Sequence, residues 1–152
     1  MGRRFLKEPD TDELLGLAFA EPELDGFMRA IGTGVPLPPF SEFITDLASE
    51  REEVPERIID RANLSKSFGH QLFNGRRKPS RDSVLQLAFG FEADYELAQE
   101  LLKVARKSQL HPRVRRDVVI IYCLQHRYTV VDAQIALDKY GLPLLGSGSH
   151  RD

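Results

Sequence analysis

The clearest hydrophobic pattern in the chain begins at Phe40. Apolar residues follow at the i, i+3, i+4, i+7, i+8 spacing, and acidic residues occupy the opposite positions. The apolar positions are Phe40, Phe43, Ile44, Leu47 and Ala48, and the acidic ones are Glu42, Asp46 and Glu50. Because this spacing places the apolar side chains on one stripe, it predicts an amphipathic α-helix.

Start and stop signals predict further helices downstream. Pro55 suits the first turn of a short helix, and Asn63-Leu64 breaks the chain after it. Four later segments begin with a side chain that can cap a helix, and three glycines stand where helices can end. The caps are Ser65, Ser80, Asp94 and Thr129, the last in a capping box with Asp132, and the glycines are Gly75, Gly90 and Gly141.

Residues 112–126 are ambiguous, because the apolar run Val118–Leu124 could form a buried strand or part of a helix. We favour a helix, since no other segment offers a strand with which it could pair its backbone. The predicted fold class is therefore all-α, a helical bundle with a helix-turn-helix and additional C-terminal helices.

The pattern divides the chain into four segments. Residues 1–38 hold two weakly amphipathic stretches, Leu14–Phe19 and Leu24–Ile31, and a linker rich in glycine and proline. Residues 39–110 form the predicted helix-turn-helix domain, residues 111–145 a C-terminal helical pair, and residues 146–152 a flexible tail.

Two short helices joined by a tight turn, between residues 54 and 81, form the motif that bears on function. After such a turn the second helix can project from the surface and enter the major groove of DNA, where short polar side chains allow a close approach. The residues predicted to face bases are Ser65, Lys66, Ser67, His70 and Gln71. Those predicted to face phosphates, around the next helix N-terminus, are Arg76, Arg77, Lys78, Ser80 and Arg81.

The stretch from Val54 to Ala88 resembles the helix-turn-helix of the lambda-repressor-like (Cro/C1, XRE) transcriptional regulators. The likeness rests on Leu64-Ser65, Leu72, Asn74-Gly75, Arg77-Lys78-Pro79-Ser80 and Leu87-Ala88. It covers about a quarter of the chain, and it implies that the helix after the turn reads the major groove. Three residues depart from the family's pattern: bulky Ile59 where a small residue is usual, Gly69 at an apolar position, and Phe73 in place of an acid.

Charge is unevenly distributed, although the net charge is only -2. Glu8 to Glu53 contains twelve acidic residues against two basic ones, whereas Arg57 to Arg81 contains seven basic residues against one acidic one. Lys103 to Arg116 adds six basic residues and no acid. A local basic surface on a nearly neutral protein can bind a phosphate backbone. Arg113 to Arg116 could extend that surface, pair with Asp117 and the acidic half, or be solvated.

Several classes of function are not expected. One cysteine, Cys123, cannot form an intramolecular disulfide, and neither a signal peptide nor a membrane-spanning run is recognisable, so we expect a cytoplasmic protein without a membrane partner. His111, His126 and Cys123 match no metal-ligand spacing. We expect neither enzymatic activity nor a cofactor.

The sequence thus predicts a transcriptional regulator that binds double-stranded DNA as a homodimer, since two-fold pairing doubles the base contacts. The candidate dimer interface is the apolar surface of the C-terminal helices, which could equally be core. Its residues are Val114, Val118, Ile121, Leu124 and Val130. The alternative is a helical protein-interaction module, antitoxin-like or an adaptor, that contacts a basic protein through the acidic N-terminal half. Residues 1–38 could fold against the core, exchange between subunits or cover the basic surface.

Overall fold

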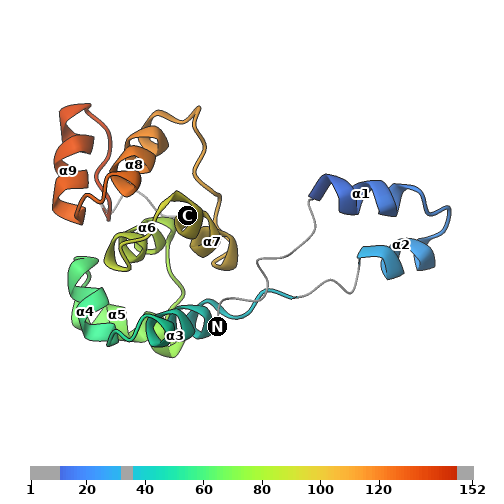
Figure 1. Ribbon diagram of the computed structural model, residues 1–152, viewed down its shortest axis with the longest axis horizontal. Coiled ribbons are helices and arrows are strands. Elements are labelled where there is room, and N and C mark those ends of the chain that lie inside the picture. The colour runs from blue at the N-terminus through green and yellow to red at the C-terminus, as the bar shows by residue number, and fades with distance from the viewer. Residues whose placement is uncertain (1–10, 32–35, 147–152) are drawn as a thin grey trace. The chain divides into compact units, whose positions relative to one another are not determined.

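All regular secondary structure in residues 11–31 and 36–146, the ranges that the computed structural model describes, is α-helical (Figure 1). The predicted all-α fold class is therefore confirmed. No helix in these ranges is long and apolar enough to cross a membrane. The helices are α1 (Thr11–Phe19), α2 (Leu24–Ile31), α3 (Phe40–Glu50), α4 (Pro55–Arg61), α5 (Lys66–Asn74), α6 (Arg81–Gly90), α7 (Tyr95–Val104), α8 (Arg115–Gln125) and α9 (Val130–Lys139).

The chain divides into two compact units, Met1–Pro38 and Pro39–Asp152. In the first, α1 packs against α2. The predicted segments 39–110 and 111–145 both lie in the second unit, where α6 contacts α9 and α7 contacts α8. Residues 32–35 of the predicted linker and 147–152 of the predicted tail lie outside the described residues. Gly146, the first residue of the predicted tail, donates its N–H to Asp82 over 2.9 Å.

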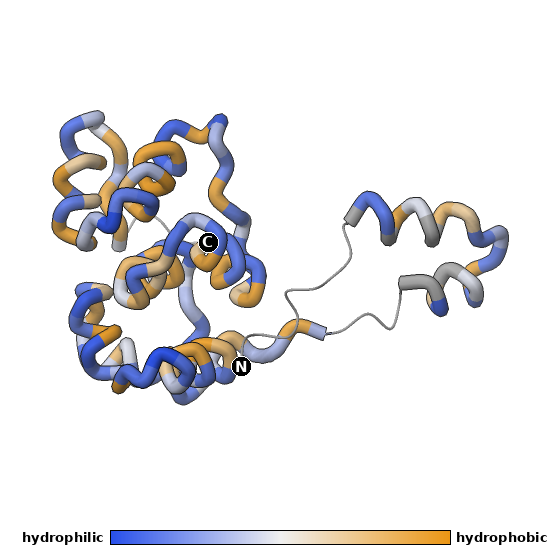
Figure 2. The backbone as a smooth tube through the Cα atoms, viewed as in Figure 1, coloured by the Kyte–Doolittle hydropathy of each residue, from blue (hydrophilic) through white to orange (hydrophobic). Residues whose placement is uncertain are grey.

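The core of the second unit is built from the apolar stripes that the sequence pattern predicts. Ile44, Leu47, Ile58 and Leu72 are fully buried where α3 and α4 pack against α5. Every residue of α6 after Arg81 is buried, and α6 contacts α4, α7 and α9. Figure 2 shows hydrophobic positions along α6, α8 and α9 as well. Helix α6 is therefore the central element around which the other helices of this unit pack.

All four predicted N-terminal caps are confirmed. The side-chain oxygen of each accepts a hydrogen bond from the backbone N–H three residues later, which stabilises a helix by about 0.5–2 kcal/mol. The distances are 3.2 Å for Ser65, 3.1 Å for Ser80, 2.9 Å for Asp94 and 3.1 Å for Thr129. Asp132 completes the capping box at α9. The sequence therefore sets the start of each of these four helices.

Gly90 does not end α6 in the predicted way. It is the last residue of the helix, and Glu92, with φ 56°, is the left-handed residue of the turn that follows. A Cβ atom at position 90 would lie 2.5 Å from the carbonyl oxygen of Ile58. Glycine is therefore required here because α4 and α6 approach each other closely. Gly75 and Gly141 do adopt positive φ at the ends of α5 and α9, as predicted.

Gly69 and Ile59, two of the three departures from the family pattern, compensate for each other. Ile59 is fully buried on α4, and a Cβ atom at position 69 of α5 would lie 2.5 Å from its Cγ2 atom. The volume that position 69 lacks is filled by the larger side chain at position 59. The pair keeps the α4–α5 interface packed, although glycine costs up to about 1 kcal/mol in a helix interior.

The sign of the effect of Gly69→Ala on stability is expected to depend on residue 59. In the wild type the added methyl group collides with Ile59, and overpacking of this kind costs about 1–3 kcal/mol. In an Ile59→Ala background, itself destabilised by about 2–5 kcal/mol, the same methyl group occupies the vacated space and should stabilise the protein. Urea unfolding of the wild type, the two single variants and the double variant measures both effects. If Gly69→Ala changed stability in the same direction in both backgrounds, this account would be contradicted.

Helices α6 and α7 (the first helix pair) and α8 and α9 (the second helix pair) repeat the same structure 35 positions apart. Gln99 and Gln134 hold Leu110 and Leu145, respectively, by two hydrogen bonds each, with lengths between 2.7 and 3.0 Å. The positive-φ residues Glu92 and Arg127, the caps Asp94 and Thr129, and the dipeptide Arg-Asp at 81–82 and 116–117 follow the same offset. The pattern of apolar positions and caps does not predict this repeat.

The two helix pairs are joined by a buried cluster of charges, the Arg–Asp cluster of Arg81, Asp82, Arg116 and Asp117. Each arginine forms a bidentate ion pair with the aspartate of the other helix pair, Arg81 with Asp117 and Arg116 with Asp82, at N–O distances of 3.0–3.2 Å. The four side chains are between 4% and 14% exposed. The two ion pairs are therefore reciprocal. The helix contacts are reciprocal too, because the first helix of each pair contacts the second helix of the other pair, α6 with α9 and α8 with α7.

The same cluster also fixes two loops. Arg81 donates from Nε to the carbonyl oxygen of Ser108, and Arg116 donates from Nε to that of Pro143, both over 2.9 Å. Asp117 accepts from the N–H of His111 over 2.9 Å, as Asp82 does from Gly146. Each member of the cluster is therefore satisfied by a charged partner and by a loop.

Removing one charge from the cluster is expected to destabilise the protein strongly. Asp117→Asn and Asp82→Asn each leave a buried arginine without its counter-charge, which costs about 3–5 kcal/mol. Asp46→Asn, an exposed site on α3, is the control and should change stability by less than about 0.5 kcal/mol. Urea unfolding measures all three, and similar losses for Asp117→Asn and Asp46→Asn would refute the structural role of the cluster.

Candidate nucleic-acid interface

Helix α5 is held at a fixed angle to α4 by a tight turn. Asn63 adopts a positive φ of 60°, and the N–H groups of Asn63 and Leu64 donate to the carbonyl oxygens of Asp60 and Ile59. Ser65 then caps α5. Because asparagine tolerates the left-handed conformation better than most residues, the predicted break at Asn63-Leu64 occurs at this turn.

Helix α5 has a buried face and an outward face. Gly69, Leu72 and Phe73 are buried. On the other side, Ser67, His70, Gln71 and Asn74 follow the i, i+3, i+4, i+7 spacing of one stripe, and Lys66 adjoins it. Lys66, Ser67 and Asn74 are exposed, whereas His70 and Gln71 are half-buried. The outward stripe therefore consists of small or hydrogen-bonding side chains.

The structure brings the five predicted base-facing residues together at this helix. Ser65 accepts the N–H of Phe68, which leaves its O–H to donate. The Nε2 atom of His70 lies 3.6 Å from a carboxylate oxygen of Glu56 on α4. Gly69 does not belong to the outward stripe, because it is buried against Ile59. Sequence reasoning did not include Asn74, which continues the outward stripe.

Three exposed cations, Arg76, Arg77 and Lys78, lie on the loop directly after α5. This loop is attached to the helix: the N–H of Arg76 donates to Oδ1 of Asn74 over 2.9 Å, and the N–H of Arg77 donates to the carbonyl oxygen of Gln71 over 3.2 Å. The guanidinium carbon of Arg77 lies 5.5 Å from the centre of the Phe68 ring. The backbone of Arg76 and Arg77 is therefore fixed relative to the outward stripe.

Arg81, which the sequence predicts to face phosphate, is not a free cation. Its guanidinium is bound by Asp117 and by the carbonyl oxygens of Ser108 and Gln109. A phosphate would have to displace a bidentate carboxylate from a largely buried site. Ser80 is half-buried, and its oxygen caps α6, as predicted. Direct contact of Ser80 with phosphate stays a prediction.

The second basic segment separates into paired and exposed residues. Arg116 pairs with Asp82, and not with Asp117 as one of the three alternatives held. Arg113 and Arg115 are exposed, and Arg115 lies 5.9 Å from the ring centre of Tyr140. The count of basic residues along the chain therefore overstates the cations that a ligand can reach.

Cys123 is a buried thiol. It is fully buried on α8. Burial raises the pKa of Cys123 from its ordinary value of 9.0 to about 11, and the nearby Asp132 carboxylate adds to the increase. His126 stacks on Tyr122 at 3.9 Å, whereas Nδ1 of His111 accepts from the N–H of Arg113. Among the described residues no group of three potential ligands could hold a metal ion.

The buried thiol is expected to make stability fall at alkaline pH. The folded-state pKa is raised, so the contribution of Cys123 is complete below pH 9.0 and is lost as the pH rises towards about 11. The loss should reach about 2–3 kcal/mol, the free energy of a two-unit pKa difference. Urea unfolding between these pH values should show a smaller decrease for Cys123→Ala than for the wild type. Equal decreases would contradict the pKa assignment.

Comparison with models of protein families, with curated proteins and with solved structures finds no match to this chain. Its function therefore has to be argued from the geometry described above. Two features bear on it most directly, namely the outward stripe of α5 and the loop of cations that is attached to this helix.

Proposed function

We propose that this protein is a transcriptional regulator that binds specific sequences in double-stranded DNA, with α4 and α5 acting as a helix-turn-helix. The observation that carries the proposal is the outward stripe of α5 beside Arg76, Arg77 and Lys78. Small and hydrogen-bonding side chains let a helix approach base edges closely, and adjacent cations position it on the phosphate backbone.

Four residues on the outward side of α5 have a chemical role in this proposal. Gln71 is suited to pair with adenine through its amide, and Lys66 can donate to the acceptors of guanine. Ser67 and His70 supply shorter contacts. Arg76, Arg77 and Lys78 bind phosphates, which fixes the register of α5 along the groove. The loop that holds them is itself bonded to α5, so the two sets of contacts are positioned together.

The resemblance to lambda-repressor-like regulators supports the same assignment. Two departures from the family's pattern, Ile59 and Gly69, exchange a large and a small side chain across the α4–α5 interface. Because the exchange conserves packing volume, it gives no reason to expect a different orientation of α5.

Selection of bound duplexes from a random library, followed by affinity measurements at several salt concentrations, tests this function. We expect a preferred site and an affinity that falls steeply with salt. Replacing Arg76, Arg77 and Lys78 by alanine removes three phosphate contacts, and the slope of log K against log salt should decrease by about 2.7.

The matched control removes the same charge elsewhere. Arg106, Arg113 and Arg127 are exposed outside the α5 surface, and their replacement by alanine should leave the slope nearly unchanged. Absence of any preferred sequence, or equal effects of the two triple variants, would refute DNA recognition by α5.

The second candidate function is a protein-interaction module, favoured by the surface of the first unit. Phe19, Leu24 and Met28 are between 53% and 73% exposed. Five exposed acidic residues accompany them, namely Asp12, Glu13, Glu21, Glu23 and Asp25. Under this alternative the triple variant of Arg76, Arg77 and Lys78 would still bind a basic protein partner.

A further inference from the structure

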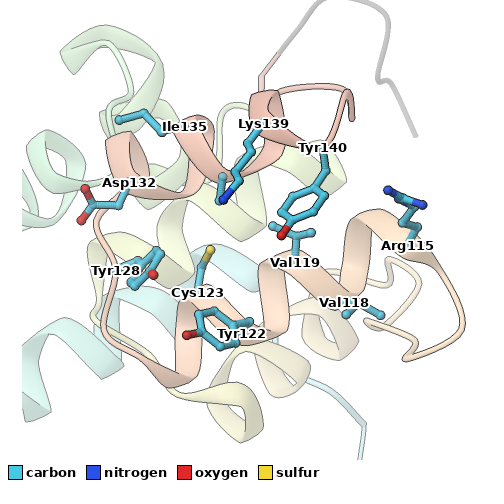
Figure 3. A pocket seen from close by; sticks show the side chains of 11 residues that line it. Arg115, Val118, Val119, Tyr122, Cys123, Tyr128, Asp132, Ile135, Lys139 and Tyr140 are labelled. Atoms are coloured by element: carbon cyan, nitrogen blue, oxygen red, sulfur yellow. The ribbon is translucent and has the colours of Figure 1, made fainter.

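A groove of about 920 Å³ runs between α8 and α9 (Figure 3). Its exposed apolar side chains are Val118 and Tyr122 on α8 and Ile135 and Tyr140 at α9, each between 45% and 63% exposed. Of the five residues predicted as a dimer interface, Val114 and Val118 are exposed, Ile121 is half-buried, and Leu124 and Val130 belong to the core. The exposed apolar surface therefore extends over both helices.

The repeat shows that this face is one that the fold covers elsewhere. The positions 35 residues before Val118, Tyr122 and Ile135 are Ser83, Leu87 and Glu100, and all three are buried. In the first helix pair, α6 contacts α4 and α7 contacts α3. Of the described elements, α8 packs mainly against α7 and α9, and α9 packs mainly against α6 and α8, while the Arg–Asp cluster links α8 to α6. The second helix pair is thus covered on the side that carries the Arg–Asp cluster. Its other side, which corresponds to the side of the first helix pair that contacts α3 and α4, is exposed.

The charges along the groove are segregated by sign. Asp132 lies near one end, and Arg115 and Lys139 flank Tyr140 towards the other (Figure 3). Seven residues separate Asp132 from Lys139 on α9, which corresponds to about 10 Å along the helix axis. If two such grooves face each other across a two-fold axis perpendicular to their length, the acidic end of one meets the basic end of the other.

We infer that this groove is the interface of a homodimer, in which α8 and α9 of one copy pack against α8 and α9 of a second copy. A two-fold contact of one surface with itself is closed, and it covers both exposed apolar faces at once. Tyrosines and aliphatic residues in the centre, with opposite charges at the rim, match the composition of stable interfaces. The inference stands independently of the proposed DNA binding.

Sedimentation equilibrium of the full chain, without DNA, measures the dissociation constant of the dimer. Ile135→Asp should raise this constant by more than about tenfold, because a charge would be buried in the interface. Val131→Asp is the control: Val131 lies on the same helix and is 59% exposed, but it does not line the groove. A monomer at about 100 µM, or equal effects of the two substitutions, would overturn the inference.

Charge reversal tests the pairing of the two ends. Asp132→Lys in one chain and the double variant Arg115→Glu, Lys139→Glu in another should each self-associate at least about tenfold more weakly than the wild type. Mixing the two variants should restore dimers, because every reversed end then meets its opposite. Circular dichroism establishes that both variants are folded. Failure of two folded variants to form mixed dimers would overturn the two-fold arrangement. Binding of a small molecule or a different protein in the groove, in place of a second copy, would also overturn it.

Discussion

The Arg–Asp cluster determines how the second unit is assembled. Four charged side chains are removed from water at the contact between the helix pairs, which is tolerable because each arginine meets a carboxylate in bidentate geometry and each carboxylate also accepts a backbone N–H. Apolar residues could pack in many registers of the two helix pairs, whereas both bidentate ion pairs can form in only one register. The cluster therefore specifies the arrangement of the helix pairs as much as it stabilises it.

The same cluster bears on the surface of α5. The loop with Arg76, Arg77 and Lys78 begins at the Asn74 side chain and the left-handed Gly75, and it ends at the Ser80 cap beside Arg81. Arg81 is fixed by Asp117 at the start of α8. Both ends of the cationic loop are thus attached to rigid elements, so under the proposed function its backbone would lose little conformational entropy on binding DNA.

Local signals predicted much of this structure. The caps at Ser65 and Thr129 and the left-handed Gly75 follow from interactions within a few residues, and the outward side of α5 follows from helical period. What failed was long-range pairing. The sequence alone predicts a free cation at Arg81, because its partner Asp117 lies 36 positions away. It predicts a loss of helix stability at Gly69, because its partner Ile59 lies on another helix. The repeat is marked by few identical residues, namely Arg81, Asp82, Val84, Ala98, Gln99, Leu102 and Leu110 in the first copy.

The reciprocity of the repeat limits how far it can extend. In an array that grows by translation, each unit binds the next through a surface that the last unit leaves open, so further copies can be added. Here each Arg-Asp dipeptide is both donor and acceptor for the other, and the exchange is complete after two copies. A third helix pair would find no unpaired member of the cluster to bind. Duplication of this hairpin therefore produces a closed pair with a fixed number of members.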